Sequence, residues 1–256
     1  MSLHSGIFLR VAESSGAIAD VWFVHGFGES GLSFQEAFSS PLVSAHNLYA
    51  PDLPGSGVTP PIPDVRSIAS AGNVLASLLT DLSGARPIVL VGHSLGSLIA
   101  VEAARLLGDR MLLLVSVEGN LTDDDTYLIR FTKFDTPETF YATLTRYIPN
   151  LDEDKEALLR YSASLRLADP ETLWHLGRSG LAATGDTLGA ESFLATTCRK
   201  AYYWGGTSLS EKSRKLLAGW PILKQEFVDA GHWPMITRTR QFYATLADDI
   251  SAACKG

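Results

Sequence analysis

The stretch Gly92-His93-Ser94-Leu95-Gly96 matches the pattern G-x-S-x-G, and it stands between an apolar run at 87–91 and a helix-like stretch at 97–107. This context predicts a buried strand, a tight turn and a helix. A serine on such a turn adopts a strained backbone conformation that lifts its hydroxyl clear of the sheet, and the flanking glycines keep the crowded turn free of side chains. Ser94 is therefore the candidate nucleophile. For the bare pattern, a glycine-rich turn that only joins a strand to a helix is the competing interpretation.

Strand-like and helix-like segments alternate along most of the chain. Apolar runs predict an edge strand, then a strand buried on both faces, and then further strands, at 7–12, 19–24, 47–50, 87–91, 111–117, 199–204 and 219–229. Helices are expected between them at 33–42, 67–82, 97–107 and 237–253. This alternation predicts an α/β fold with a mostly parallel, doubly wound sheet.

The strand signals stop between residues 121 and 190, where helical stretches are expected at 123–134, 136–148, 152–168 and 170–183. We interpret this segment as a helical cap inserted into a core made of 1–120 and 191–256. The chain is then one structural domain plus a lid. Most aromatic residues of the cap are expected to pack within it, with Phe131 and Trp174 as candidates to face a substrate pocket.

Composition limits the possible partners. The chain has 256 residues, 46% of them hydrophobic and 19% charged, as in ordinary globular proteins, and it has no apolar run of about 18 residues. A net charge of −7 from scattered acidic groups opposes binding to nucleic acid or to an anionic membrane surface. Cys198 and Cys254 lie far apart without metal-ligand spacing, and the N-terminus has no basic segment followed by an apolar one, so neither zinc binding nor secretion is expected. We therefore expect a cytoplasmic protein with a small-molecule substrate and no metal or organic cofactor, and the oligomeric state stays open.

A second turn follows the strand expected at 19–24, at His25-Gly26-Phe27-Gly28. Glycines directly after a buried strand let the backbone turn sharply and aim N–H groups outward, as a developing oxyanion requires. The N–H of Phe27 is the candidate oxyanion donor, together with that of Leu95 in the serine turn. Taken alone, this stretch is equally typical of a plain turn.

Two further residues complete a candidate triad. Glu118 follows the strand expected at 111–117, and because parallel strands end at a common edge, it is expected beside Ser94. A strand-end acid that meets water or caps a turn is the alternative. His232 lies in a glycine-flanked loop after the last expected strand, and it is preferred over His25 as the base because the backbone of His25 is needed in the glycine turn. Asp52, in the turn-rich loop 51–57, is expected to order its own loop.

With these residues the chain resembles the α/β-hydrolase superfamily over nearly its whole length, specifically the capped, cofactor-free branch of small esterases, carbon–carbon bond hydrolases and haloperoxidase-like enzymes. The resemblance rests on four motifs in the expected order: His25-Gly26-Phe27-Gly28, Asp52-Leu53-Pro54-Gly55-Ser56-Gly57, Gly92-His93-Ser94-Leu95-Gly96 and Gly231-His232-Trp233-Pro234. It implies an α/β-hydrolase fold with triad residues in the chain order serine, acid, histidine.

The sequence departs from the superfamily at the acid. Many members place an aspartate after the penultimate strand, in a W-G-x-x-D-like stretch, where this chain has Ser208. Others, notably haloalkane dehalogenases, carry the acid after the strand that follows the nucleophile, where Glu118 lies. Those dehalogenases and the related epoxide hydrolases use an aspartate nucleophile, which Ser94 speaks against. Glu118 is thus the preferred acid, expected about 2.6 to 3.2 Å from a ring nitrogen of His232, with Asp229 and the cluster at 123–125 as weaker substitutes.

The predicted reaction is hydrolysis of an ester or similar acyl bond through an acyl-enzyme, by Ser94, His232 and Glu118 with the N–H groups of Phe27 and Leu95. Trp233 and Met235 are expected to give the pocket an apolar mouth, suited to a small apolar substrate. One alternative is a hydrolase-like protein that binds a small ligand, or signals, with little turnover. Another is a carbon–carbon bond hydrolase acting on a dione.

Overall fold

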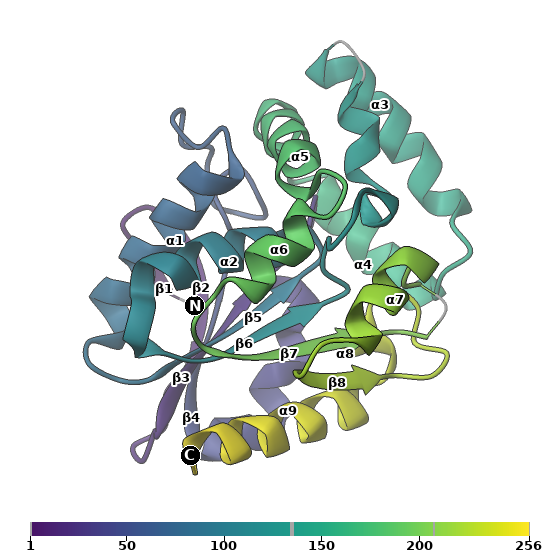
Figure 1. The fold of residues 1–256 in the computed structure, drawn as a ribbon. Coiled ribbons are helices and arrows are strands. Elements are labelled where there is room, and N and C mark those ends of the chain that lie inside the picture. The colour runs from purple at the N-terminus through teal and green to yellow at the C-terminus, as the bar shows by residue number, and fades with distance from the viewer. Residues whose placement is uncertain (1, 134–135, 207, 256) are drawn as a thin grey trace.

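The computed structural model describes residues 2–133, 136–206 and 208–255 and folds them around one eight-stranded sheet of order β1-β2-β4-β3-β5-β6-β7-β8. Strands β1 and β4 pair with β2 in antiparallel fashion, and all other neighbours pair in parallel. This arrangement, seen in Figure 1, confirms the predicted α/β-hydrolase fold. The strands are β1 (Ser2–His4), β2 (Ile7–Ala12), β3 (Ala19–Val24), β4 (His46–Pro51), β5 (Ile88–His93), β6 (Met111–Val117), β7 (Arg199–Trp204) and β8 (Leu223–Glu226).

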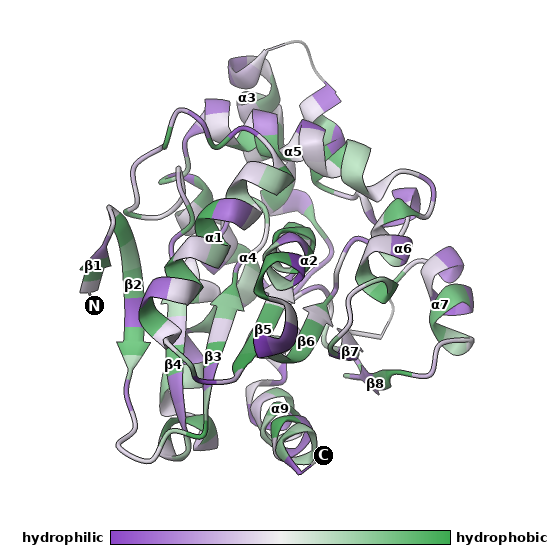
Figure 2. Cartoon of the chain, turned by 60° about the vertical axis from the view of Figure 1, so that its left-hand side comes forward, coloured by the Kyte–Doolittle hydropathy of each residue, from purple (hydrophilic) through white to green (hydrophobic). Residues whose placement is uncertain are grey.

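The central strands are buried because helices cover both faces of the sheet. Every residue of β3 and β5 is buried, as expected for parallel strands between two helical layers. Helices α1 (Ile68–Ser83) and α2 (Leu95–Leu107) pack against each other on one face, and α9 (Thr239–Cys254) lies on the other (Figure 1). Figure 2 shows the central strands as mostly hydrophobic. This rigid centre carries the loops that form the candidate site.

Between β6 and β7 the described residues form helices and no strand. We call residues 121–194 the cap segment, because α6 continues past the predicted boundary at residue 190. Thr136 and Asp169 cap α3 and α5, and a proline occupies the first turn of each, as predicted. The cap segment contains η4 (Asp123–Asp125), η5 (Ile129–Lys133), α3 (Pro137–Tyr147), η6 (Ile148–Asn150), α4 (Lys155–Leu165), α5 (Pro170–Thr184) and α6 (Leu188–Leu194).

Several predicted elements differ from the structure. The strand at 7–12 is not at the edge, because β1 pairs outside it, with Leu3 opposite Phe8. The helix expected at 33–42 is a pair of 3₁₀ helices, η1 (Gly31–Ser39) and η2 (Pro41–Ser44), because Ser40 ends the first and Pro41 opens the second. The helix expected at 123–134 is two 3₁₀ helices, and residue 134 lies outside the described residues.

The region after β7 also differs. Within the strand expected at 219–229, only the four residues of β8 form a strand. This strand is largely exposed and pairs with β7 at the end of the described sheet. Helix α7 (Glu211–Ala218) was not predicted, since its short sequence is mostly polar. Two short helices complete the core, η3 (Gly108–Arg110) before β6 and α8 (Pro234–Thr237) after β8.

Candidate active site

Ser94 stands on a tight turn between β5 and α2, as predicted. Its φ is +50°, a left-handed conformation that costs a serine free energy. The neighbouring glycines are required, since a Cβ on Gly92 would lie 2.7 Å from the carbonyl oxygen of Gly96 and one on Gly96 would lie 2.3 Å from that of His25. The Ser94 N–H donates to the carbonyl oxygen of Val117 at 2.9 Å, which ties the turn to the end of β6.

The glycine loop after β3 lies directly beside this turn. A Cβ on Gly26 would lie 3.0 Å from Nδ1 of His93 and 3.1 Å from the Cβ of Ser94, so a larger residue would require these neighbours to shift. The loop is closed by the Glu29 N–H, which donates to the carbonyl oxygen of Gly26 at 3.3 Å. Across the described ranges, the N–H groups of Phe27 and Leu95 have no hydrogen-bond acceptor. Both N–H groups are therefore available to a bound molecule.

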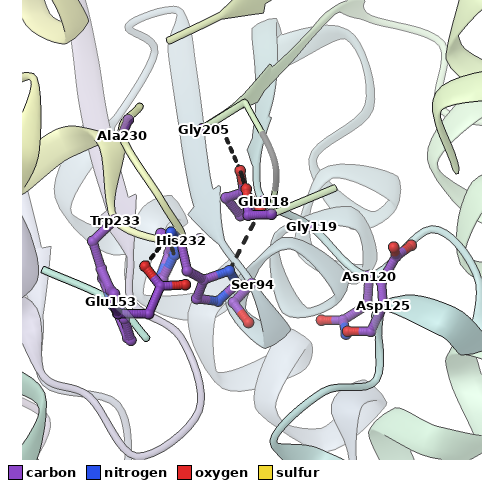
Figure 3. Close-up of polar contacts among 12 residues, drawn as sticks. Ser94, Glu118, Gly119, Asn120, Asp125, Glu153, Gly205, Ala230, His232 and Trp233 are labelled. Atoms are coloured by element: carbon purple, nitrogen blue, oxygen red, sulfur yellow. Dashed lines mark hydrogen bonds and ion pairs between the residues drawn. The ribbon is translucent and has the colours of Figure 1, made fainter. Parts of the chain in front are cut away.

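His232 comes to the same place from the loop after β8. Its carbonyl oxygen accepts a hydrogen bond from Nε2 of His93 at 2.8 Å, and the two imidazole centroids are 4.8 Å apart. Since His93 immediately precedes Ser94, this contact brings the His232 loop to the serine turn. In the view of Figure 3, the His232 ring lies between Glu118 and Ser94.

Glu118 supplies the carboxylate next to His232. Its Oε2 lies 3.5 Å from Nδ1 of His232, longer than the distance expected from the sequence. Its Oε1 accepts hydrogen bonds from the Gly205 N–H and, at 2.6 Å, from the Ser208 hydroxyl. Burial alone would lower the pKa of His232, but hydrogen bonding to Glu118 and its negative charge outweigh burial and raise that pKa.

The other acids considered from the sequence have different partners. Asp229 is exposed. Asp125 accepts from the N–H groups of Leu121 and Thr122. Asp52 orders its own loop as expected, accepting from Arg10 at 2.6 Å and from two backbone N–H groups.

His25, the alternative base, is a structural residue. Its Nε2 accepts the Leu53 N–H at 3.0 Å, and its Nδ1 donates to the carbonyl oxygen of Gly26 at 2.9 Å. Burial lowers the pKa of His25, so the neutral ring that these two contacts require is favoured. The ring thereby joins the glycine loop to the loop after β4.

Glu29 is a central residue that the sequence did not reveal. Its buried carboxylate accepts from the Gly26 N–H at 3.0 Å and from the Trp233 indole N–H at 2.8 Å, and it lies 3.0 Å from Nδ1 of His93. Burial favours the neutral acid, but the charge of His93 and these hydrogen bonds lower the pKa of Glu29 to about 2. One carboxylate thus joins the three loops around Ser94. No local pattern marks it, because two of its three partners, His93 and Trp233, are distant in sequence.

Helices of the cap segment pack directly on these loops. A Cβ on Gly28 would lie 2.9 Å from both Leu165 and the Tyr161 hydroxyl of α4. A Cβ on Gly177 of α5 would lie 3.1 Å from the Phe27 ring. The cap therefore touches the backbone next to Ser94, and its helices limit the space above the serine.

Of the four residues expected to line a substrate pocket, two are fully buried and two are half-buried. Trp233 and Met235 are 1% and 0% exposed, so their side chains are buried, and their role in a pocket stays a prediction. Phe131 and Trp174 are half-buried, with the Phe131 ring against Tyr147 and Arg178 over Trp174, and their role in a pocket stays a prediction.

A cavity of about 310 Å³ lies on the Glu118 side of His232, and Ser94 is not part of its wall. The lining is strongly acidic. It consists of Glu118, Gly119, Asp124, Asp125, Tyr127, Asp152, Glu153, Tyr202, Ser208, Leu209, Gly231 and His232. Within the described parts of the chain, no three His, Cys, Asp or Glu side chains are arranged to hold a metal ion. The helices described there include none long and apolar enough to cross a membrane.

Two curated relatives match short parts of the chain. The dihydrolipoyllysine-residue acetyltransferase component of the acetoin cleaving system of Cupriavidus necator is 33% identical over 99 residues, 39% of this chain. The pimeloyl-[acyl-carrier protein] methyl ester esterase of Methylococcus capsulatus is 35% identical over 101 residues, 40% of this chain. The chain spans only 26% and 36% of the lengths of these relatives.

The likeness in structure is much more extensive. A thermophilic esterase from Thermogutta terrifontis superposes with a TM-score of 0.77 at 20% identity, over 96% of this chain and 93% of the esterase. That similarity concerns the fold. A model of the alpha/beta hydrolase family matches residues 23–245, which include every loop of the site. The chain therefore belongs to the alpha/beta hydrolase family, and hydrolysis is the class of reaction that its family supports.

Proposed function

We propose that this protein is a serine hydrolase that cleaves an ester or similar acyl bond of a small substrate through an acyl-enzyme. The observation that carries the proposal is the contact between the Glu118 carboxylate and Nδ1 of His232, 3.5 Å apart, beside a serine on a strained strand-to-helix turn. The names of two similar proteins, the methyl ester esterase and the thermophilic esterase, favour an ester as the bond that is cleaved.

The first half of the reaction is acylation. The Ser94 hydroxyl attacks the carbonyl carbon of the ester while its proton passes to Nε2 of His232. The oxygen of the tetrahedral intermediate becomes negative, and the free N–H groups of Phe27 and Leu95 stabilise it. His232 then gives its proton to the departing alcohol oxygen as the bond to carbon breaks.

In the second half, water attacks the acyl-enzyme and gives a proton to His232. His232 returns this proton to the Ser94 oxygen as the carboxylic acid leaves. Throughout, Glu118 keeps the Nδ1 proton directed toward itself and stabilises the positive imidazolium. The hydrogen bonds from Gly205 and Ser208 hold Glu118 in place for this role. Because Oε1 is fixed in this way, Oε2 is the oxygen that faces the histidine.

The surroundings of the site favour a small, uncharged substrate. Cap residues such as Tyr161 and Leu165 lie close to the glycine loop and limit the volume above Ser94. The carboxylates around His232 would repel a negatively charged group placed next to them. A short-chain neutral ester meets both conditions.

The test is a pre-steady-state assay with p-nitrophenyl acetate, together with labelling by a fluorophosphonate. The proposal requires a rapid burst of nitrophenol and a covalent label on Ser94. Ser251→Ala, which changes a serine of α9 on the opposite face of the sheet, is the matched control and should leave both unchanged. No burst, or a label on another residue, would contradict the proposal. Turnover of diones without ester turnover would instead support carbon–carbon bond hydrolysis.

A further inference from the structure

A carboxylate of the cap segment contacts the loop that carries His232. Glu153 lies in the turn between η6 and α4, and its Oε2 accepts a hydrogen bond from the backbone N–H of His232 at 3.1 Å. Figure 3 shows Glu153 and Glu118 approaching His232 from different directions. The histidine is thus held by two carboxylates, one on its ring and one on its backbone.

Two glycines next to His232 allow Glu153 and the loop after β7 to approach its backbone closely. Gly231 has a φ of +62°, and a Cβ on it would lie 2.2 Å from Oε2 of Glu153. On the other side, a Cβ on Gly205 would lie 1.7 Å from the carbonyl oxygen of Gly231. The peptide before His232 is therefore packed between a loop of the core and an acid of the cap.

Glu153 also acts on His232 by its charge. Burial raises the pKa of Glu153, and the negative charge of Glu118 raises it further. The hydrogen bond from His232 and the charge of that residue lower the pKa, but burial outweighs them. In the other direction, the charge of Glu153 contributes to the raised pKa of His232. The titratable groups that contact the histidine or share its cavity come from both parts of the chain. They are Glu118, Glu29, His93 and Tyr202 of the core and Asp124, Asp125, Tyr127, Asp152 and Glu153 of the cap.

We propose that Glu153 is a positioning residue for His232, through which the cap segment holds the histidine loop and places a carboxylate beside it. This inference rests on the proposed function, in which His232 is the general base. The histidine is then fully ordered only while the cap is seated on the core. If the cap moved away from the core, the His232 N–H would lose its acceptor, and the imidazole would lose a nearby negative charge.

Two substitutions separate the hydrogen bond from the charge. Glu153→Gln keeps an oxygen that can accept the His232 N–H but loses the charge. The imidazolium is then less stable, so the acid limb of the pH profile of kcat/KM should move to lower pH while the plateau changes little. Glu153→Ala also loses the acceptor, so kcat should fall about tenfold as His232 loses its alignment, with a smaller change in KM.

The experiment measures kcat and kcat/KM for p-nitrophenyl acetate from pH 5 to pH 9 in the wild-type protein, Glu153→Gln, Glu153→Ala and Asp152→Asn. Asp152→Asn is the matched control, because it removes an equal charge from the neighbouring exposed residue without a hydrogen bond to His232. In parallel, NMR titration of the His232 ring follows its protonation without any turnover. If Glu153→Ala fails to fold, Glu153→Gln alone decides.

The inference requires the His232 titration to move to lower pH in Glu153→Gln by more than in Asp152→Asn. It is overturned if the titration and the acid limb stay in place, or if both variants move them equally. A wild-type protein that lacks esterase turnover would defeat the proposed function only. In that case the NMR titration still decides whether Glu153 acts on His232.

Discussion

The hydroxyl of Ser208 donates a hydrogen bond to Oε1 of Glu118 across 2.6 Å. Ser208 occupies the position after β7 where the resemblance places the usual acid, and Glu118 supplies a carboxylate from the end of β6 instead. The two positions converge because β6 and β7 are paired, with Val117 opposite Tyr203 and the Glu118 N–H bonded to the Tyr203 carbonyl oxygen. Ser208, at the position where many members of the superfamily carry the acid, therefore helps to hold Glu118 in place.

The first prediction concerns Ser94→Ala. Without the nucleophile, the remaining groups only bind and polarise the substrate, so turnover of p-nitrophenyl acetate should fall by about 10⁴-fold or more. The fold should persist, because the turn keeps its glycines. Steady-state kinetics and thermal unfolding measure the two effects. Residual activity within tenfold of the wild-type value would mean that another residue attacks the ester.

The second prediction concerns Glu118→Gln, which keeps the shape of the side chain but removes its charge. Turnover should fall by about 10²- to 10⁴-fold, because the imidazolium loses its counter-ion. The charge of Glu118 raises the pKa of His232, and the reaction needs the neutral ring. Loss of the charge should therefore move the acid limb of kcat/KM to lower pH. The control is Asp229→Asn, which alters an exposed acid and should retain normal rates.

The third prediction tests whether the acid can be moved back to the end of β7. In Ser208→Asp combined with Glu118→Gln, the new carboxylate starts from a position already in contact with residue 118. The double variant should recover at least about tenfold of the turnover lost in Glu118→Gln alone. Ser208→Asp alone should be less active than the wild-type protein, since two adjacent carboxylates disfavour the ionised state of both. Kinetics of all three variants measure this, and a double variant no better than Glu118→Gln would show that residue 208 cannot reach the histidine.

Much of the fold could be predicted because its strongest signals are local. Runs such as 19–24 and 111–117 are apolar except for Asp20 and Ser116, since parallel strands covered on both faces have no solvent-exposed side that requires alternating polar residues. Ser94 is recognisable because its tight turn between a strand and a helix needs Gly92 and Gly96. Since parallel strands end at one edge, the positions of Glu118 and His232 after strands were enough to place them near the serine turn.

The rest depends on contacts between distant segments. Glu29 and Glu153 lie in loops with ordinary sequences. Only the packed structure shows that His93 and Trp233, which contact Glu29, are 64 and 204 residues away, and that His232, which contacts Glu153, is 79 residues away. Trp233 and Met235 were assigned to a pocket because they flank His232, yet a flanking residue in a loop can equally point into the core. Strand β1 escaped prediction because three residues that pair with a single neighbour carry little pattern.

The last prediction concerns the buried carboxylate that joins the three loops. In the folded protein the pKa of Glu29 is about 2, below its ordinary value of 4.5. A lowered pKa means that Glu29 contributes stability above pH 4.5, and that this contribution is lost as the pH falls toward 2. The difference corresponds to about 3 kcal/mol in the free energy of unfolding.

Glu29→Gln should therefore unfold more easily at pH 7, by roughly 3 to 5 kcal/mol, because the buried groups of His93, Gly26 and Trp233 lose the carboxylate that they contact. Urea unfolding at pH 7, 4.5 and 3 measures this directly. The wild-type protein should lose stability across the acidic range, and Glu29→Gln should lose less, since the group that titrates is gone. Glu13→Gln, which alters an exposed glutamate, controls for a general change in net charge and should follow the wild-type curve. If Glu29→Gln follows that curve as well, the carboxylate does not hold the loops together, and the order around Ser94 must come from the glycine turns and the cap.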